Sequence, residues 1–267
     1  MSHMEEYKKS EAQFVAQFGE DNELSKIFAS VPQGTCVEVG GFDGITGSNT
    51  YYFERIGWEC LLVEPIPELC EKIRKIRKCT LVQAAASSKS GTATLIVPEK
   101  FKELSTLHLS KIQQDRILAE GGAELNEITV QVKTLDQILQ DASITKIDFI
   151  TIDVEGHEIE VLKGFTIQSY TPRVIILEDS FCRRDQSAVN YLRHFGYVNF
   201  KRTGCNDWFC KLTDSSLIDS GQVTRLRLLR KKAAVLTIFA PLVRRVKPLL
   251  SNSVISWLKA ISFGKDT

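Results

Sequence analysis

The hydrophobic positions of this chain fall into short continuous runs that alternate with segments of helical spacing. Five of these runs are mainly aliphatic: Cys36–Val39, Cys60–Val63, Thr80–Gln83, Phe149–Ile152 and Val174–Leu177. Helical segments follow four of them, at 49–56, 67–76, 158–162 and 185–194. Continuous apolar runs are typical of strands buried on both faces. Their alternation with helices predicts an α/β fold, a mostly parallel sheet with helices on both faces.

Four more apolar runs fall outside this alternation. Tyr197–Phe200 and Trp208–Lys211 predict an antiparallel pair that closes the sheet and brings it to seven strands. Thr92–Val97 and Ile128–Val132 predict two extra strands, with the polar segment 101–126 between them. Two interpretations of this segment stay open, a lid over a site and a plain surface insertion.

The two ends of the chain differ from its middle. Residues 1–30 start with Met1-Ser2-His3-Met4, which resembles a cloning remnant, and then show helical spacing that predicts covering helices. Residues 215–267 combine clustered cations with the apolar stretch 233–243, which predicts a basic amphipathic helical tail. We therefore expect the main domain at 31–214, with an insertion around 92–132.

The charge is divided unevenly along the chain. The formal net charge of the 267 residues is only +1, but the part from Arg225 onward carries +9 and the preceding residues carry −8. An acidic main body argues against nucleic acid as a partner. For the tail, two interpretations stay open: residues 225–263 contact an anionic membrane surface, or they pack on the acidic body or in a homodimer.

The cysteine content and the hydropathy of the sequence indicate the cellular location of the protein. The seven cysteines are an odd number and contain no CxxC pair, which favours reduced, buried thiols over a zinc site. No apolar stretch reaches the ~20 residues that cross a bilayer. We expect a cytoplasmic protein, with peripheral membrane contact through the tail as the alternative.

The most informative segment follows the first predicted strand. It reads Val37-Glu-Val-Gly-Gly-Phe-Asp-Gly44. Gly40 and Gly44 let the backbone turn tightly near a ligand, and Glu38 can fix the loop or receive a cationic group. The dinucleotide pattern GxGxxG, started at Gly40, would require glycines at positions 42 and 45, which are Phe and Ile. An NAD-dependent oxidoreductase is therefore the weaker alternative.

Acidic residues also follow the second and the fourth strand of the predicted parallel sheet. Glu64 ends the second, where an acid commonly accepts hydrogen bonds from ribose hydroxyls. Asp153 and Glu155 end the fourth, and Gly156 lets the chain turn into the next helix. Ligands bind at the carboxyl ends of such strands, so these side chains are expected in one cleft.

Together these motifs resemble the FkbM family of methyltransferases. The similarity spans roughly residues 30–212 and rests on three segments: Glu38–Gly44 with Ser48-Asn49-Thr50, Leu62-Val63-Glu64-Pro65, and Ile152–Glu158 with Val161–Gly164. The resemblance implies a Rossmann-like class I methyltransferase fold and S-adenosylmethionine as the methyl donor. It also implies a small-molecule or glycan acceptor, with the hydroxyl on a sugar, a glycolipid or a polyketide-like molecule.

The resemblance assigns a set of residues to the cofactor. They are Glu38, Gly40, Asp43, Gly44, Ser48, Asn49, Glu64, Gln83 and Ala84. The first four would line the methionine part, the next two would open the helix above it, Glu64 would hold the ribose, and the last two would flank the adenine. A member that binds the cofactor without turnover is the second alternative function.

Methyl transfer to an alcohol needs alignment of the oxygen with the methyl carbon and benefits from a positioned base. The candidates for this catalytic role are Asp153, Glu155 and His157. A divalent metal is not expected, although Asp153 with Glu178 or Asp179 would supply hard oxygen ligands for Mg²⁺ or Ca²⁺.

Overall fold

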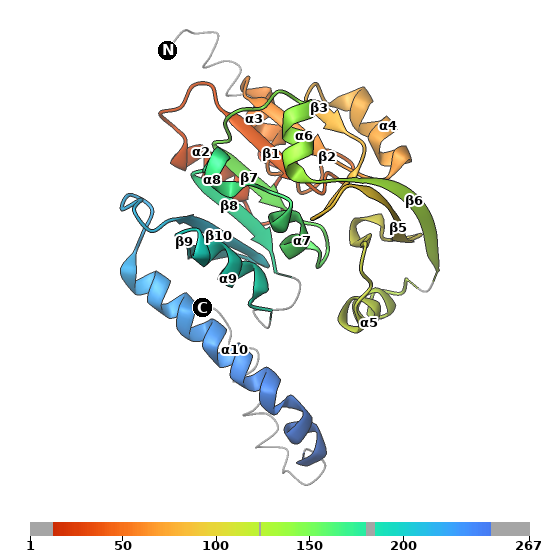
Figure 1. Cartoon of the computed structure of the whole chain (residues 1–267), viewed down its shortest axis with the longest axis vertical. Coiled ribbons are helices and arrows are strands. Elements are labelled where there is room, and N and C mark those ends of the chain that lie inside the picture. The colour runs from red at the N-terminus through yellow and green to blue at the C-terminus, as the bar shows by residue number, and fades with distance from the viewer. Residues whose placement is uncertain (1–12, 123, 180–184, 247–267) are drawn as a thin grey trace.

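The computed structural model describes residues 13–122, 124–179 and 185–246. Its centre is a seven-stranded sheet in the order β3-β2-β1-β7-β8-β10-β9 (Figure 1). The strands are β3 Thr80–Val82, β2 Glu59–Val63, β1 Thr35–Val39, β7 Phe149–Ile152, β8 Val174–Glu178, β10 Asn206–Lys211 and β9 Tyr197–Thr203. The first five are parallel, whereas β10 runs antiparallel to both β8 and β9. The predicted Rossmann-like, mostly parallel seven-stranded sheet is confirmed.

Helices cover both faces of this sheet because successive strand residues point to opposite sides. In β7, Ile150 and Ile152 point to one side and belong to one hydrophobic core, whereas Phe149 points to the other side and belongs to the second core. The first core is covered by α6 Leu135–Asp141, α7 Glu158–Lys163, α8 Ile167–Tyr170 and α9 Ser187–His194. The second is covered by α2 Glu20–Ile27, α3 Tyr51–Arg55 and the start of α10 Ser220–Val246.

A second, smaller sheet stands beside the large one. It has the order β4-β6-β5 and consists of β4 Ala85–Ala86, β6 Leu125–Lys133 and β5 Gly91–Pro98. Its apolar face packs on the start of α4 Pro67–Ile76 through Ile66 and Leu69. Between β5 and β6 lie the short helix η1 Lys102–Leu104 and α5 Lys111–Ala119, which extend below the small sheet in Figure 1. The insertion is therefore a structured unit.

Several helix boundaries differ from the sequence expectation. The helix predicted from residue 49 begins at Tyr51, because Ser48, Asn49 and Thr50 are held in the preceding loop by Glu38. Helices α5, α6 and α8 were not expected at all. The covering helices predicted over 1–30 are represented by α2, and residues 1–12 lie outside the described residues.

The long C-terminal helix α10 begins at Ser220, five residues before the cationic cluster that predicted it. The part of the expected tail beyond Val246 lies outside the described residues, as does Cys182. The six cysteines that the structure describes are all free. Among the described residues, no helix combines the length and the apolar character that a bilayer span requires.

Candidate active site

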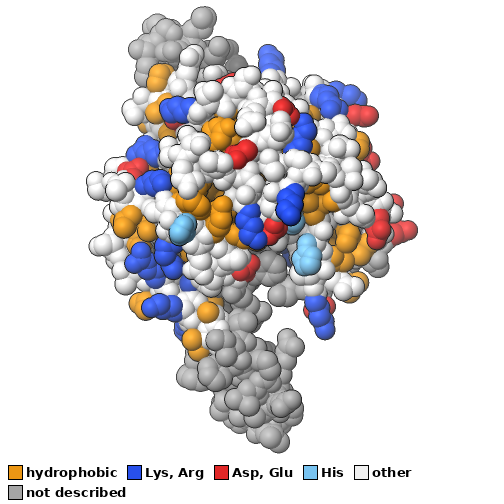
Figure 2. Space-filling model, in the orientation of Figure 1, with side chains coloured by type: hydrophobic (Ala, Val, Ile, Leu, Met, Phe, Trp, Pro, Cys, Tyr) orange, Lys and Arg blue, Asp and Glu red, His pale blue; other side chains and the backbone are white. Residues whose placement is uncertain are grey.

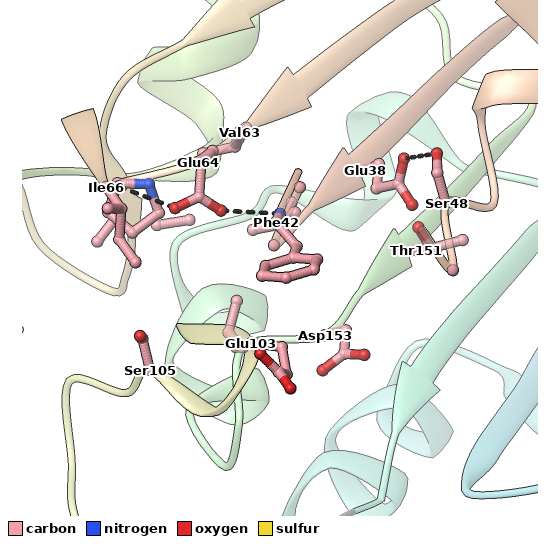
Figure 3. Close-up of a pocket in the computed structure, with 18 of the residues that line it drawn as sticks. Glu38, Phe42, Ser48, Val63, Glu64, Ile66, Glu103, Ser105, Thr151 and Asp153 are labelled. Atoms are coloured by element: carbon pink, nitrogen blue, oxygen red, sulfur yellow. Dashed lines mark hydrogen bonds between the residues drawn. The ribbon is translucent and has the colours of Figure 1, made fainter. Parts of the chain in front are cut away.

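A cavity of about 560 Å³ opens at the carboxyl ends of β1, β2 and β7 (Figure 3). Eight of the predicted site residues line it: Glu38, Gly40, Ser48, Asn49, Glu64, Ala84, Asp153 and His157. The glycine bend and the acids of three separate motifs therefore line one cavity. The sequence predicted this, because each motif follows a strand of the parallel sheet.

The floor of the cavity is tied together by backbone hydrogen bonds between neighbouring strand ends. The Gly40 N–H donates to the carbonyl of Val63 over 3.0 Å, and the Asp153 N–H donates to the carbonyl of Val39 over 2.9 Å. Gly40 has φ +95°, and a Cβ atom there would lie 1.8 Å from the Asp153 carbonyl oxygen. Both the conformation and the close approach thus require glycine.

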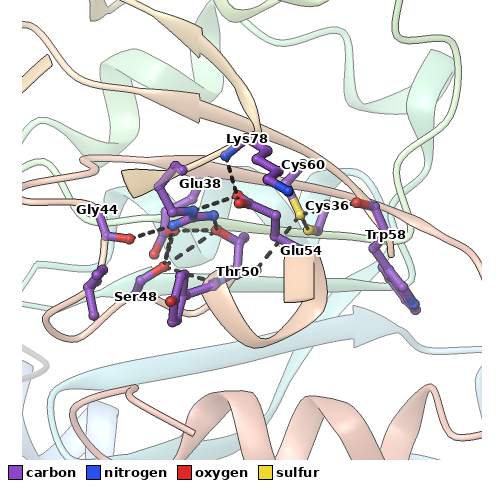
Figure 4. A network of polar contacts seen from close by, with 12 residues as sticks. Cys36, Glu38, Gly44, Ser48, Thr50, Glu54, Trp58, Cys60 and Lys78 are labelled. Atoms are coloured by element: carbon purple, nitrogen blue, oxygen red, sulfur yellow. Dashed lines mark hydrogen bonds and ion pairs between the residues drawn. The ribbon is translucent and has the colours of Figure 1, made fainter. Parts of the chain in front are cut away.

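The Glu38 carboxylate organises the loop that follows β1 (Figure 4). It accepts hydrogen bonds from the Ser48 hydroxyl, the Asn49 N–H and the Thr50 hydroxyl at 2.7, 2.8 and 2.5 Å. The buried Arg77 guanidinium donates to the same two hydroxyl oxygens and to the Gly44 carbonyl. Buried charges are stable only when paired and hydrogen-bonded, and this network meets that condition.

One buried polar atom of the same loop has no hydrogen-bond partner among the described residues. The Asn49 side-chain oxygen is buried and accepts no hydrogen bond among the described residues, although Asn49 lines the cavity. A buried acceptor without a donor costs free energy. The position is therefore suited to a ligand that carries an N–H or O–H group.

Glu64 is a buried acid held in a defined orientation (Figure 3). Its two carboxylate oxygens accept hydrogen bonds from the N–H groups of Phe42 and Ile66, at 2.9 and 2.8 Å. Burial raises its pKa to about 7, although these N–H groups act in the opposite direction. Each oxygen retains a further lone pair, so the carboxylate can still accept hydrogen bonds from a ligand in the cavity.

Asp153 belongs to a cluster of acids at the ends of β7 and β8. Oxygen atoms of Asp153, Glu155 and Glu178 lie within 4.8 Å of one another. The Asp153 side chain is exposed in the cavity, whereas Glu155 and Glu178 are buried. Desolvation by the surrounding protein and the nearby carboxyls of Glu178 and Glu155 raise the pKa of Asp153 well above its usual range. Such a carboxyl is a stronger base than an ordinary aspartate when it is ionised.

This cluster revises the metal-ligand set considered from the sequence. Asp179 pairs instead with Arg202 at 2.9 Å and with Arg230 at 3.6 Å, whereas Glu155 joins Asp153 and Glu178. The Arg116 guanidinium lies 2.9 Å from Glu155 and 3.7 Å from Glu178. A cation of the chain itself thus offsets part of the negative charge in the cluster.

His157 lines the cavity from the start of α7. Its Nε2 atom forms a hydrogen bond of 2.9 Å with the Ser87 hydroxyl. Burial lowers its pKa, which favours the neutral form of the ring. A neutral imidazole can accept a proton, and this geometry keeps His157 as a second candidate base.

The insertion between β5 and β6 supplies the roof of the cavity. Residues 102–103 and 105–107 line the space opposite the strand ends. The roof is attached to the loop after β7 at Glu155. The Glu155 carbonyl accepts hydrogen bonds from the Thr106 hydroxyl, at 3.0 Å, and from the Gln113 amide, and the Glu155 carboxylate pairs with Arg116. Of the two open interpretations of the insertion, the lid is the one this geometry supports.

Four of the predicted residues lie beside the cavity rather than in its lining. Asp43 accepts hydrogen bonds from Ile45 and Thr46 and shapes the loop, and Gly44 has φ +85° at the turn. The exposed Gln83 side chain contacts Arg74 at 3.0 Å. The fourth, Glu155, points into the acidic cluster described above.

The strand order, the glycine bend after β1 and the acid after β2 define the fold of a class I methyltransferase. The model of the FkbM methyltransferase domain matches residues 38–198 of the chain. The chain therefore belongs to the FkbM family of methyltransferases, and this membership favours methyl transfer over the oxidoreductase alternative. A search of curated proteins gave no match.

The chain is similar to several solved structures at low identity. The precorrin-6y C5,15-methyltransferase of Geobacter metallireducens is 12% identical, with a TM-score of 0.38 over 76% of this chain and 93% of that one. Human methyltransferase-like protein 13 in complex with SAH is 13% identical, with a TM-score of 0.39 over 86% and 92%. The fibrillarin/Nop5p complex is 12% identical, with a TM-score of 0.37 over 73% and 83%.

Proposed function

We propose that this protein transfers the methyl group of S-adenosylmethionine to a hydroxyl of a sugar, glycolipid or polyketide-like acceptor. The observation that carries the proposal is the shared cavity of Gly40, Glu64 and Asp153, roofed by the insertion. It combines a nucleoside-type binding floor with a candidate base, in a chain that belongs to a methyltransferase family.

The residues present fit the cofactor. Glu64 offers carboxylate lone pairs that suit the two vicinal ribose hydroxyls. The buried Asn49 side-chain oxygen has no partner in the described part of the chain and suits the amino group of the methionine part. Ala84, buried at the end of the β3 region, provides an apolar surface for the adenine. When bound, S-adenosylmethionine supplies a methyl group on a sulfonium that is already activated.

The remaining chemistry falls to the acceptor side of the cavity. Asp153 and His157 both line it, and either can take the proton of an acceptor hydroxyl. We assign this role to Asp153, because it ends the central strand β7 and its raised pKa suits a base. His157 then orients the acceptor, together with the Ser87 hydroxyl to which it is bound.

The test is a release assay for S-adenosylhomocysteine with sugar, glycolipid and polyketide alcohols, each with Mg²⁺ and with EDTA. The proposal expects turnover with at least one alcohol and equal rates in both conditions. Stabilisation by S-adenosylhomocysteine without turnover on any acceptor would instead favour the non-catalytic alternative. Turnover with amines alone would support methyl transfer but contradict the proposal that the acceptor is a hydroxyl.

A further inference from the structure

The helix α10 has one face fixed to the body of the protein. Val223 and Leu226 are buried, and Val223 belongs to the hydrophobic core on that side of the sheet. One turn further on, the Arg230 guanidinium is buried in an ion pair with Asp207 of β10. Residues three and four apart lie on the same side of a helix. The first half of α10 is therefore rigidly oriented.

The opposite face of α10 carries cations interleaved with apolar side chains. Lys231 and Lys232 are exposed, as is Arg227 on the flank. Leu228 and Val235, seven residues apart and thus on one side of the helix, are 61% and 51% exposed. In the view of Figure 2, basic and hydrophobic side chains lie together over the region where Figure 1 shows the first part of α10. This exposed face is called the outer face of α10 below.

The positive charge of the sequence is concentrated in its C-terminal part, to which this helix belongs. The sequence from Arg225 onward carries +9, against −8 for the rest. Within it, residues 233–243 contain no charged residue, and Arg244 and Arg245 follow directly. Cations that flank an apolar stretch on a helix are the pattern of interfacial helices, which rest on anionic lipid with their apolar residues inserted.

We propose that the outer face of α10 binds the surface of an anionic lipid membrane. The apolar residues favour lipid over nucleic acid, because a phosphate backbone is bound by cations and offers no apolar phase to Leu228 and Val235. The long lysine stems at 231 and 232 can lie along the apolar surface while their ammonium groups reach the lipid phosphates. Because Arg230 and Val223 fix the helix, membrane binding would orient the whole catalytic body. The inference stands independently of the methyl acceptor.

The experiment is vesicle flotation of the full-length protein. The probes are vesicles of phosphatidylcholine with about one third phosphatidylglycerol, compared with pure phosphatidylcholine. The test variant is R227Q/K231Q/K232Q. Each cation near such a surface contributes about fivefold in partitioning, so the triple variant should lose about 100-fold. The wild type should bind the anionic vesicles only, and high salt should weaken the binding.

A matched control separates this face from net charge alone. K75Q/K89Q/K100Q removes three exposed lysines elsewhere on the body, outside the cavity lining, and should bind like the wild type. A further variant, L228Q/V235Q, should also lose binding while its circular dichroism stays that of the wild type. Absent binding by the wild type would overturn the proposal, and so would equal loss in the control. Salt-sensitive binding of RNA in place of vesicles, or a dimer that R227Q/K231Q/K232Q abolishes, would overturn it as well.

Discussion

At the scale of single residues, Glu64 combines two properties that rarely occur together, namely burial and open acceptor capacity. It is 4% exposed, and its carboxylate accepts hydrogen bonds from backbone N–H groups, among them those of Phe42 and Ile66, without filling all four lone pairs. We expect Glu64→Gln to weaken the binding of S-adenosylhomocysteine by about 10- to 100-fold, the range for hydrogen bonds to a charged group. Isothermal titration calorimetry measures this. An unchanged affinity would remove Glu64 from the cofactor site.

The affinity for S-adenosylhomocysteine should also depend on pH through Glu64. Its pKa of about 7 in the free protein means that the carboxyl gains a proton as the pH falls through 7. The protonated form loses acceptor capacity, so the affinity should be about tenfold lower at pH 6 than at pH 8. Titrations at both values, repeated with Glu64→Gln, check this. The variant should show a flat profile, and a wild-type profile in the variant would assign the titration to another group.

For the reaction itself, Asp153 is the residue to test. Asp153→Asn keeps the size of the side chain and removes its basicity, so turnover should fall by about 10²- to 10⁴-fold. Cofactor affinity should remain within a few fold, because the carboxylate is assigned to the acceptor. His157→Gln provides the comparison, with a smaller expected loss. Turnover of Asp153→Asn at the wild-type rate would transfer the role of base to His157.

Most residues of the cavity floor could be located from the sequence. Gly40, Glu64 and Asp153 each follow an apolar run, and strand ends in a parallel sheet meet at one edge. Arg77 and Arg116 could not be located in this way. Arg116 contacts Glu155 at a sequence separation of 39, and no periodicity marks that pairing. Long-range polar contacts depend on how elements are placed in space, which short patterns do not encode.

At the scale of elements, the roof contacts the loop after β7 at Glu155, and its residue Arg116 also pairs with Glu178 of β8. Replacing Arg116 with Gln removes an ion pair to Glu155 and Glu178 but leaves the hydrogen bonds of Thr106 and Gln113. Because Arg116 is 40% exposed, we expect a modest effect of about 1 kcal/mol. That corresponds to about fivefold faster release of S-adenosylhomocysteine.

Stopped-flow displacement with a fluorescent analogue measures this release. Arg116→Lys keeps the positive charge and should recover part of the wild-type rate. The same rate in all three proteins would show that the ion pair does not hold the roof. The sequence left the role of this segment open because its polar composition is the same for a lid and for a surface loop. The helix α5 and its capping box at Ser110 became visible only in the structure.

At the scale of the whole molecule, the acidic cluster makes stability depend on pH. Glu158, at the start of α7, is buried and interacts electrostatically with Glu178 of this cluster. Burial raises the pKa of Glu158 from its usual value of 4.5 to about 8, and the pKa values of Glu155 and Asp153 are raised as well. The folded state therefore binds more protons than the unfolded state between about pH 4.5 and 8. Stability conferred by these groups is present at low pH and is lost as the pH rises through this window.

Each pKa unit corresponds to about 1.4 kcal/mol, so a few kcal/mol depend on this cluster. Thermal unfolding of the free protein should shift to lower temperature between pH 6 and pH 8.5. Glu158→Gln should reduce the shift, because the amide stays neutral and its oxygen can still accept from the Gly156 N–H. Equal shifts of the unfolding temperature in the wild type and in Glu158→Gln would show that another group titrates in this pH range.

The attachment of α10 can also be tested at this scale. Arg230→Met removes one partner of Asp207, which keeps an ion pair of 2.9 Å with Arg202. We therefore expect a loss of about 1–2 kcal/mol rather than the 3–5 typical of a fully orphaned buried charge. Urea unfolding measures it, with the exposed Arg227→Met as the control. The clustered cations of the sequence predicted this helix. Its contact with β10 could not be predicted, because the ion pair joins residues of two elements that are separate in the sequence.

The main-chain hydrogen bonds that join the strand ends on the cavity floor have a consequence for changing the acceptor specificity of the enzyme. Residues at the strand ends are bound to one another through the main chain, and position 40 admits no side chain at all. Substitutions meant to broaden the range of methyl acceptors should therefore be confined to Lys102, Glu103, Ser105 and Leu107, which line the same cavity and take no part in the main-chain hydrogen bonds between the strand ends. A library of variants at these positions would test new acceptors, while the cavity floor proposed to bind the nucleoside stays unchanged.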